Sequence, residues 1–134
     1  MLLLLVIAAG GIAGSLARYG VSRAISVDDL GALPWATLTV NAVGCLLIGI
    51  LATALPLATR HWWARPLLIT GVLGGFTTFS AFAMETGLLL ESGRIAAAAS
   101  YVGATVFLGL FAVRLGTFVT TRRSARPTTD GGQT

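Results

Sequence analysis

Hydrophobic residues along this chain form four long runs separated by short polar joints. The runs cover about residues 2–24, 33–57, 66–90 and 95–119. Each is long enough for a helix of about 20 residues, which crosses the roughly 30 Å hydrocarbon core of a bilayer at about 1.5 Å per residue. The pattern predicts an all-α integral membrane protein whose four transmembrane helices form one domain, residues 1–121.

Aromatic and polar residues gather at the ends of these runs, as is typical of a membrane surface. Trp35 and Tyr19 mark one surface, and Trp62 and Trp63 mark the other. Beyond the last run, residues 122–134 are polar, basic and rich in glycine and threonine, which predicts a disordered tail.

The composition agrees with this class, since 55% of the residues are hydrophobic and only 10% are charged. A net charge of +4 would suggest nucleic acid as the partner of a soluble protein. Here the arginines lie at helix ends and in the tail, so we expect contact with the lipid bilayer and no nucleic acid. Cys45 is the only cysteine and His61 the only histidine, a set too small for a disulfide framework or a side-chain metal site.

The arginines orient the chain only weakly. Four spans place both termini and the second polar joint, residues 60–65, on one face of the membrane. That face carries Arg60, Arg65 and the tail arginines, against Arg23 and Arg94 on the other. The positive-inside rule favours the cytoplasm for the first face, but the joints alone carry two arginines on each side.

Two charged residues lie inside the runs, where a charge is costly. Arg18, in the first run, and Glu85, in the third, fall at similar depth near the same membrane face. We expect a structural pair that holds these helices together, with a role in an ion's entryway as the alternative.

Polar residues also occur on the second and fourth runs. Asn41 lies about 9 Å of helix inward from Trp35 and needs hydrogen-bond partners, either on another helix or on a ligand. Tyr101 and Thr105 are four residues apart, so they share one helix face at a similar depth.

The third run carries the sequence Gly74-Gly75-Phe76-Thr77-Thr78-Phe79-Ser80-Ala81-Phe82 near its midpoint. Because lipid offers no hydrogen bonds to loosened backbone, this segment predicts a helix broken at mid-membrane that faces protein or water. Freed carbonyl groups favour a small cation, and new helix ends favour an anion.

The side chains around the predicted break suit a small anion. Phe79 and Phe82 project from the same side, and the edges of their rings are electropositive. Thr78 and Ser80 add hydroxyl donors. No nucleophile with a neighbouring base is present in this segment, so it does not indicate an enzyme. It indicates weak binding of an ion by several groups, as conduction requires.

Small residues at helical spacing, such as Gly10 with Gly14 and Gly71 with Gly75, predict close helix packing. Four short helices packed in this way leave no room for a pore of their own. Conduction would therefore follow an interface between subunits.

These motifs together resemble the Fluc (CrcB) family of fluoride channels along nearly the whole chain. Three strings carry the match: Gly10-Gly11-Ile12-Ala13-Gly14 with Arg18-Tyr19, Thr37-Leu38-Thr39-Val40-Asn41 with Gly44 and Gly49, and Gly71 through Phe82 with Glu85. Ala81 is a small departure, because the family often has threonine there.

The resemblance implies a fluoride-selective channel in the cell inner membrane that passively exports fluoride and so limits its toxicity. It also implies an antiparallel, dual-topology dimer with two pathways along its interface. The weak orienting signal fits a homodimer, which we favour. The tail arginines would suit a heterodimer with a paralogous chain of fixed topology.

By the same resemblance, the ring edges of Phe79 and Phe82 line the pathway and Asn41 meets the ion in a polar vestibule. The implied pathway residues are Asn41, Thr78, Phe79, Ser80, Phe82, Tyr101 and Thr105. The backbone carbonyls of Gly74 and Thr77 from both subunits would hold one structural sodium ion on the two-fold axis.

Two other classes of protein share some of these features. A proton-coupled antiporter of the small multidrug-resistance type needs an acid in its first helix, and residues 2–19 contain none. A structural or assembly subunit would explain the glycines, but not Phe79 and Phe82 beside a broken helix.

Overall fold

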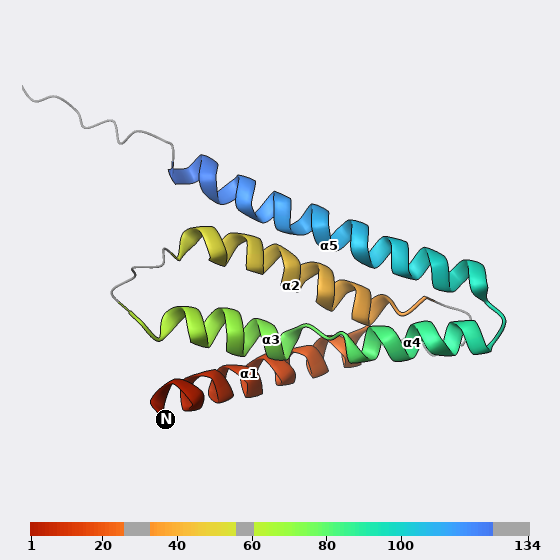
Figure 1. Cartoon of the computed structure of the whole chain (residues 1–134), viewed down its shortest axis with the longest axis horizontal. Helices are drawn as coiled ribbons and strands as arrows, with labels where there is room; N and C mark the ends of the chain where they lie inside the picture. The colour runs from red at the N-terminus through yellow and green to blue at the C-terminus, as the bar shows by residue number, and fades with distance from the viewer. Residues whose placement is uncertain (26–32, 56–60, 125–134) are drawn as a thin grey trace, which may run out of the picture.

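The computed structural model describes residues 1–25, 33–55 and 61–124, and within these every regular element is a helix (Figure 1). Arg60 and most of the predicted tail, residues 125–134, lie outside the described part. The elements in chain order are α1 (Leu2–Ala24), α2 (Trp35–Ala54), the π-helix η1 (Pro66–Leu73), α3 (Gly74–Phe76), α4 (Ser80–Glu91) and α5 (Ile95–Ser124).

Four segments are long and apolar enough to cross a membrane, as predicted. They are α1, α2, the composite segment Pro66–Glu91, and α5 over Ile95–Arg122. The boundaries differ most for α2, which spans Trp35–Ala54, and for α5, which continues to Ser124, so the first positions of the predicted tail are helical. Large hydrophobic side chains are exposed on all four crossings, as expected of surfaces that face lipid.

The third crossing begins as a π-helix and not as the uniform α-helix that its hydrophobic run predicts. Its first helical turns therefore follow the wider i→i+5 pattern. Pro66 occupies the first helical position, where its missing N–H costs no hydrogen bond.

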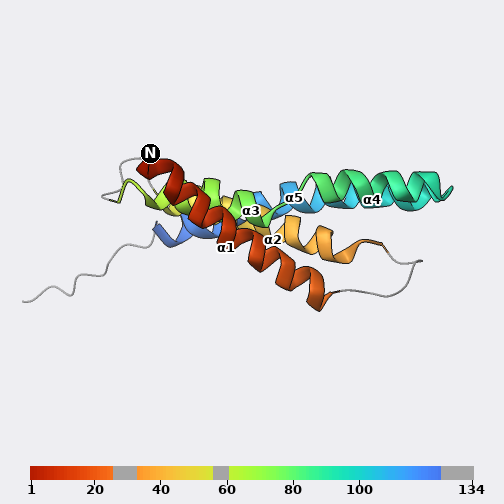
Figure 2. The same ribbon diagram turned by 90° about the horizontal axis from the view of Figure 1, so that it is seen from below.

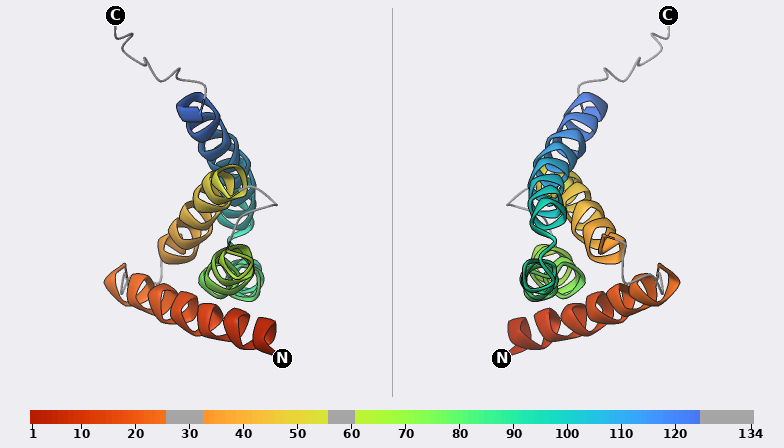
Figure 3. Two further views of the ribbon diagram at one scale, coloured as in Figure 1. Left: turned by 90° about the vertical axis from the view of Figure 1, so that its left-hand side faces the viewer. Right: turned by 90° about the vertical axis from the view of Figure 1, so that its right-hand side faces the viewer.

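Glycines bring α1 against the first half of the third crossing. A Cβ atom on Gly10 would lie 2.5 Å from the Leu67 carbonyl oxygen, and one on Gly14 would overlap the Val72 carbonyl oxygen. This confirms the predicted close packing. α1 crosses η1 and α3 and then diverges from α4 (Figure 2), whereas α2 packs mainly on α5 (Figure 3).

A tight turn joins α4 to α5. Gly93 has a positive φ of 75°, which glycine adopts without steric cost. Its N–H bonds to the Leu90 carbonyl, and the N–H of Arg94 bonds to the Leu89 carbonyl. These are the two bonds of a Schellman motif, which ends α4 and lets α5 return alongside it.

Candidate functional site

The helical hydrogen bonding of the third crossing is interrupted between α3 and α4. Thr77 still donates its N–H to the Leu73 carbonyl at 2.9 Å, but its backbone is extended (φ −75°, ψ 158°), and α4 begins only at Ser80. The neighbouring α2 supplies replacement partners. The Asn41 side chain accepts the Thr78 N–H and donates to the Thr78 carbonyl, both at 2.9 Å.

The Thr78 side chain serves the same segment by capping the start of α4. Its hydroxyl oxygen accepts the N–H of Ala81 at 3.2 Å. In an unbroken α-helix, the N–H groups of Thr78 and Ala81 would bond to the carbonyls of Gly74 and Thr77, four residues earlier. Both N–H groups bond to side chains instead, so these two carbonyls lose their usual helical donors.

α1 contacts the same segment through the carbonyl group of Gly75. This oxygen accepts hydrogen bonds from Ser15 Oγ at 3.4 Å and from Arg18 Nε at 3.2 Å. The expected pair between Arg18 and Glu85 is wrong, because each of the two has other partners. The reason is the path of α1, which makes no contact with α4, the helix of Glu85, in the described part of the chain.

Glu85 instead joins three helices. One carboxylate oxygen accepts the Thr37 hydroxyl of α2 at 2.8 Å, and the other accepts the Tyr101 hydroxyl of α5 at 2.6 Å. Tyr101 is fully buried. It belongs to a small core cluster with Leu38, Leu89 and Ala98. A carboxylate held by two hydroxyl donors is far cheaper to bury than an isolated one.

Next to the interruption lies an open groove of about 360 Å³ between α2, α5 and the third crossing. It is mostly apolar, with polar groups gathered at the interruption. Its lining residues are Asn41, Cys45, Ile48, Thr77, Thr78, Phe79, Phe82, Thr105 and Val106.

Two phenylalanine rings form one wall of this groove. The ring centroids of Phe79 and Phe82 are 5.9 Å apart with an interplanar angle of 47°. The Phe79 side chain is 79% exposed, so it projects away from its own subunit. Phe82 is backed by the Tyr101 ring, with the centroids 5.3 Å apart, which fixes the inner ring of the pair.

The groove brings together most of the residues that the sequence singled out, namely Asn41, Thr77, Thr78, Phe79, Phe82 and Thr105. Ser80 lies beside it, with its hydroxyl oxygen 3.3 Å from that of Thr78. Tyr101 does not line it and lies buried behind Phe82.

Sequence reasoning missed the part played by Thr37, the hydroxyl donor to Glu85. A signal was present, because Thr37 is four residues before Asn41 and therefore on the same face of α2. Cys45 and Ile48 continue this face toward the other end of the groove.

Comparison with known proteins places the chain in a family. Residues 5–117 match the family model described as "CrcB-like protein, Camphor Resistance (CrcB)". A protein of Paracoccus denitrificans named fluoride-specific ion channel FluC is 49% identical over 82% of this chain and 87% of its own length. A protein of the same name from Thermus thermophilus is 46% identical, over 84% of this chain and 90% of its own length. The chain belongs to the CrcB-like protein family.

Proposed function

We propose that this chain is a fluoride-selective ion channel that exports fluoride passively from the cytoplasm. The proposal rests on the composition of the groove. Two phenylalanine rings lie beside hydroxyl and amide groups, and the described lining residues include no charged side chain. Such a surface attracts an anion through many weak contacts and does not trap it. The relatives named as fluoride-specific ion channels support the choice of ion.

In this proposal, fluoride moves past the ring edges of Phe79 and Phe82. Asn41 contributes one N–H of its NH₂ group to the Thr78 carbonyl and keeps the second for the ion. The hydroxyl groups of Thr78 and Ser80 extend the polar side of the pathway. Thr105 lines the pathway on α5, with its hydroxyl proton donated to the Tyr101 carbonyl. Tyr101 acts from behind, through its contact with Phe82.

The working unit is an antiparallel dimer of dual topology. In one subunit the groove is open along its side, and Phe79 is largely exposed. A second copy inserted in the opposite orientation would cover both, and two-fold symmetry would then create two equivalent pathways. We favour a homodimer over a pair of paralogous chains, since the arginines of the joints give no clear orientation.

A structural sodium ion would lie on the two-fold axis, held by the carbonyls of Gly74 and Thr77 from each subunit. Support comes from the diversion of their helical donors to Asn41 and Thr78 side chains. Within the described residues, no group of three or more His, Cys, Asp or Glu side chains offers an alternative metal site. Carbonyl oxygens suit a hard cation such as sodium.

Fluoride efflux from lipid vesicles that contain only this purified chain tests the pathway. Phe79→Ile removes the ring edge but keeps an apolar side chain, and we expect efflux to slow by at least about tenfold, or roughly 1.4 kcal/mol of barrier. Phe107→Ile is the matched control, because Phe107 is 70% exposed on α5 and does not line the groove. Equal efflux from both variants would exclude the groove as the pathway.

A further inference from the structure

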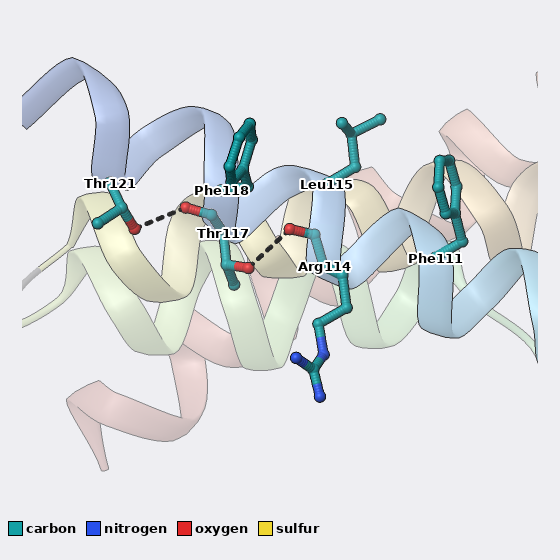
Figure 4. Close-up of a pocket in the computed structure, with 6 residues that line it drawn as sticks. All are labelled: Phe111, Arg114, Leu115, Thr117, Phe118 and Thr121. Atoms are coloured by element: carbon teal, nitrogen blue, oxygen red, sulfur yellow. Dashed lines mark hydrogen bonds between the residues drawn. The ribbon is translucent and has the colours of Figure 1, made fainter.

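A second groove, of about 520 Å³, lies on the outer face of α5 near its C-terminal end (Figure 4). Its lining residues are Phe111, Arg114, Leu115, Thr117, Phe118 and Thr121. In the close-up, the guanidinium group of Arg114 projects to one side of the helix, and the side chains of Phe111, Leu115 and Phe118 project to the other. The short threonine side chains leave the space between these two sides open.

This groove faces away from the helix bundle. Gly116 packs on α2, because a Cβ atom there would lie 2.5 Å from the Leu46 carbonyl oxygen. Arg114 and Phe118 are two residues before and after Gly116, which places both on the opposite face of the helix. Both are exposed. The groove therefore lies on a surface that the described part of the subunit leaves open to its surroundings.

Two cations flank the aromatic ring in the groove. The guanidinium carbon of Arg122 lies 4.3 Å from the centroid of the Phe118 ring, which holds it on this face by a cation–π contact. Arg114 is one helical turn on the other side of Phe118. Residues 95–124 contain no aspartate or glutamate, so nothing on this helix neutralises the pair.

The hydroxyl groups in the groove cannot serve as donors to a ligand without breaking bonds. Thr117 donates to the Arg114 carbonyl and Thr121 donates to the Thr117 carbonyl, both at 2.8 Å. The two guanidinium groups are thus the donors, and an anion with several oxygen atoms is the ligand that they fit best.

The depth of the groove narrows the identity of that anion. α5 carries no charge from Ile95 to Val113, and the distance from Ile95 to Arg114 is about 29 Å of helix at about 1.5 Å per residue. This equals the thickness of the hydrocarbon core, roughly 30 Å. Arg114 therefore lies at the level of lipid phosphates, and Phe111 lies one turn deeper, at the level of the acyl chains.

We propose that this groove binds an anionic phospholipid. Its headgroup covers the two helical turns from Arg114 to Arg122, where the two guanidinium groups reach its oxygen atoms from opposite sides. One acyl chain runs over Phe111 and Leu115. The lipid gains charge-assisted hydrogen bonds at its headgroup and apolar contact below it. Because this groove shares no lining residue with the fluoride groove, the proposal does not depend on the proposed transport function.

Native mass spectrometry of the full-length protein in neutral detergent provides the test. The protein is titrated with phosphatidylglycerol, phosphatidylcholine or inorganic phosphate. We expect retention of phosphatidylglycerol alone, and about 30-fold weaker retention by the double variant Arg114→Gln/Arg122→Gln. Arg23→Gln, which changes an exposed arginine in the last turn of α1, is the control and should bind as the unmodified chain does.

Four results would overturn the proposal. Equal retention of phosphatidylcholine would show that charge is not recognised, and equal retention of inorganic phosphate would show that no lipid is required. Unchanged phosphatidylglycerol binding by the double variant would place the lipid elsewhere. Loss of an oligomeric state in the double variant, measured without added lipid, would show that this face contacts another copy of the chain.

Phe118→Leu keeps the apolar surface but removes the cation–π contact. It should weaken binding less than the double variant does, and it provides a measurement if the double variant fails to fold.

Discussion

The side-chain amide of Asn41 forms two hydrogen bonds with the backbone of Thr78, one through each of its polar atoms. A planar amide carries one acceptor and one donor group side by side, and so matches the N–H and C=O of a single residue. Asn41 thereby supplies hydrogen bonds to the segment between α3 and α4, where the helical hydrogen bonds are interrupted. The groove that we assign to fluoride is built around this contact.

Replacing Asn41 with leucine should destabilise the protein. Leucine has nearly the same size but leaves the Thr78 N–H and C=O unpaired, at a cost of about 1 to 3 kcal/mol for each buried group. We expect a lower thermal unfolding midpoint in detergent and slower fluoride efflux. Cys45→Ala, one turn along the same groove wall, is the control. A midpoint for Asn41→Leu equal to that of Cys45→Ala would show that the two hydrogen bonds contribute nothing.

Thr78→Val should weaken the start of α4, because valine cannot accept the Ala81 N–H. The loss of such a cap costs about 1 kcal/mol, and Thr78→Ser should restore most of it by keeping the hydroxyl. Hydrogen exchange of the first-turn amides of α4 is the direct measurement. Identical protection in the valine and serine variants would contradict the capping role.

Gly14→Ala should disrupt the packing of α1 on the third crossing, since the added methyl group would overlap the Val72 carbonyl. Overpacking of this kind typically costs about 1 to 3 kcal/mol. Gly20→Ala is the matched control, because a Cβ there has no neighbour within 4 Å. We expect a lower yield of folded protein and a lower unfolding midpoint only for Gly14→Ala. Similar behaviour of the two variants would contradict the close approach.

The bond between Tyr101 and Glu85 can be measured by a double-mutant cycle. Tyr101→Phe removes a hydrogen bond to a carboxylate, worth about 1.5 to 3 kcal/mol. In a Glu85→Gln background the same change should cost less, because the acceptor is then neutral. Unfolding midpoints of the four proteins give the coupling. Strict additivity would mean that the 2.6 Å contact does not contribute to stability.

The sequence predicts the crossings well because the length of an apolar run is set by the thickness of the bilayer. The resemblance to the Fluc family singles out Asn41, Phe79 and Thr105 as pathway residues, and all three line the groove. Depth along a helix says nothing about the angle at which two helices cross. The Arg18–Glu85 pair failed for this reason: α1 diverges from α4, and Arg18 meets the Gly75 carbonyl instead.

The burial of Tyr101 was likewise beyond prediction from helical spacing. Spacing places Tyr101 and Thr105 on one face, but the wall of the groove passes between them. Thr105 lines the groove, whereas Phe82 covers Tyr101. The hydrophobic pattern does not predict the π-helical start of the third crossing. The residues from Leu67 to Ile69 are all apolar, so they would fit an α-helix and a π-helix equally well.

Loss of the gene provides a test in the living cell. In acidic surroundings, fluoride enters cells as the neutral acid and is trapped inside as the anion. A passive anion leak would lower the fluoride concentration in the cytoplasm. A strain without this chain should stop growing at fluoride concentrations that its parent tolerates, with growth in matched chloride unchanged. Restoration by the Phe107→Ile variant but not by Phe79→Ile would tie the phenotype to the groove.

Ion selectivity of this chain can be measured directly in lipid vesicles. Vesicles that carry only the purified protein are loaded with either fluoride or chloride, and the efflux of each anion is followed with an ion-selective electrode. We predict rapid loss of fluoride and retention of chloride. Comparable efflux of both anions, or retention of both, would contradict a fluoride-selective channel formed by this chain alone.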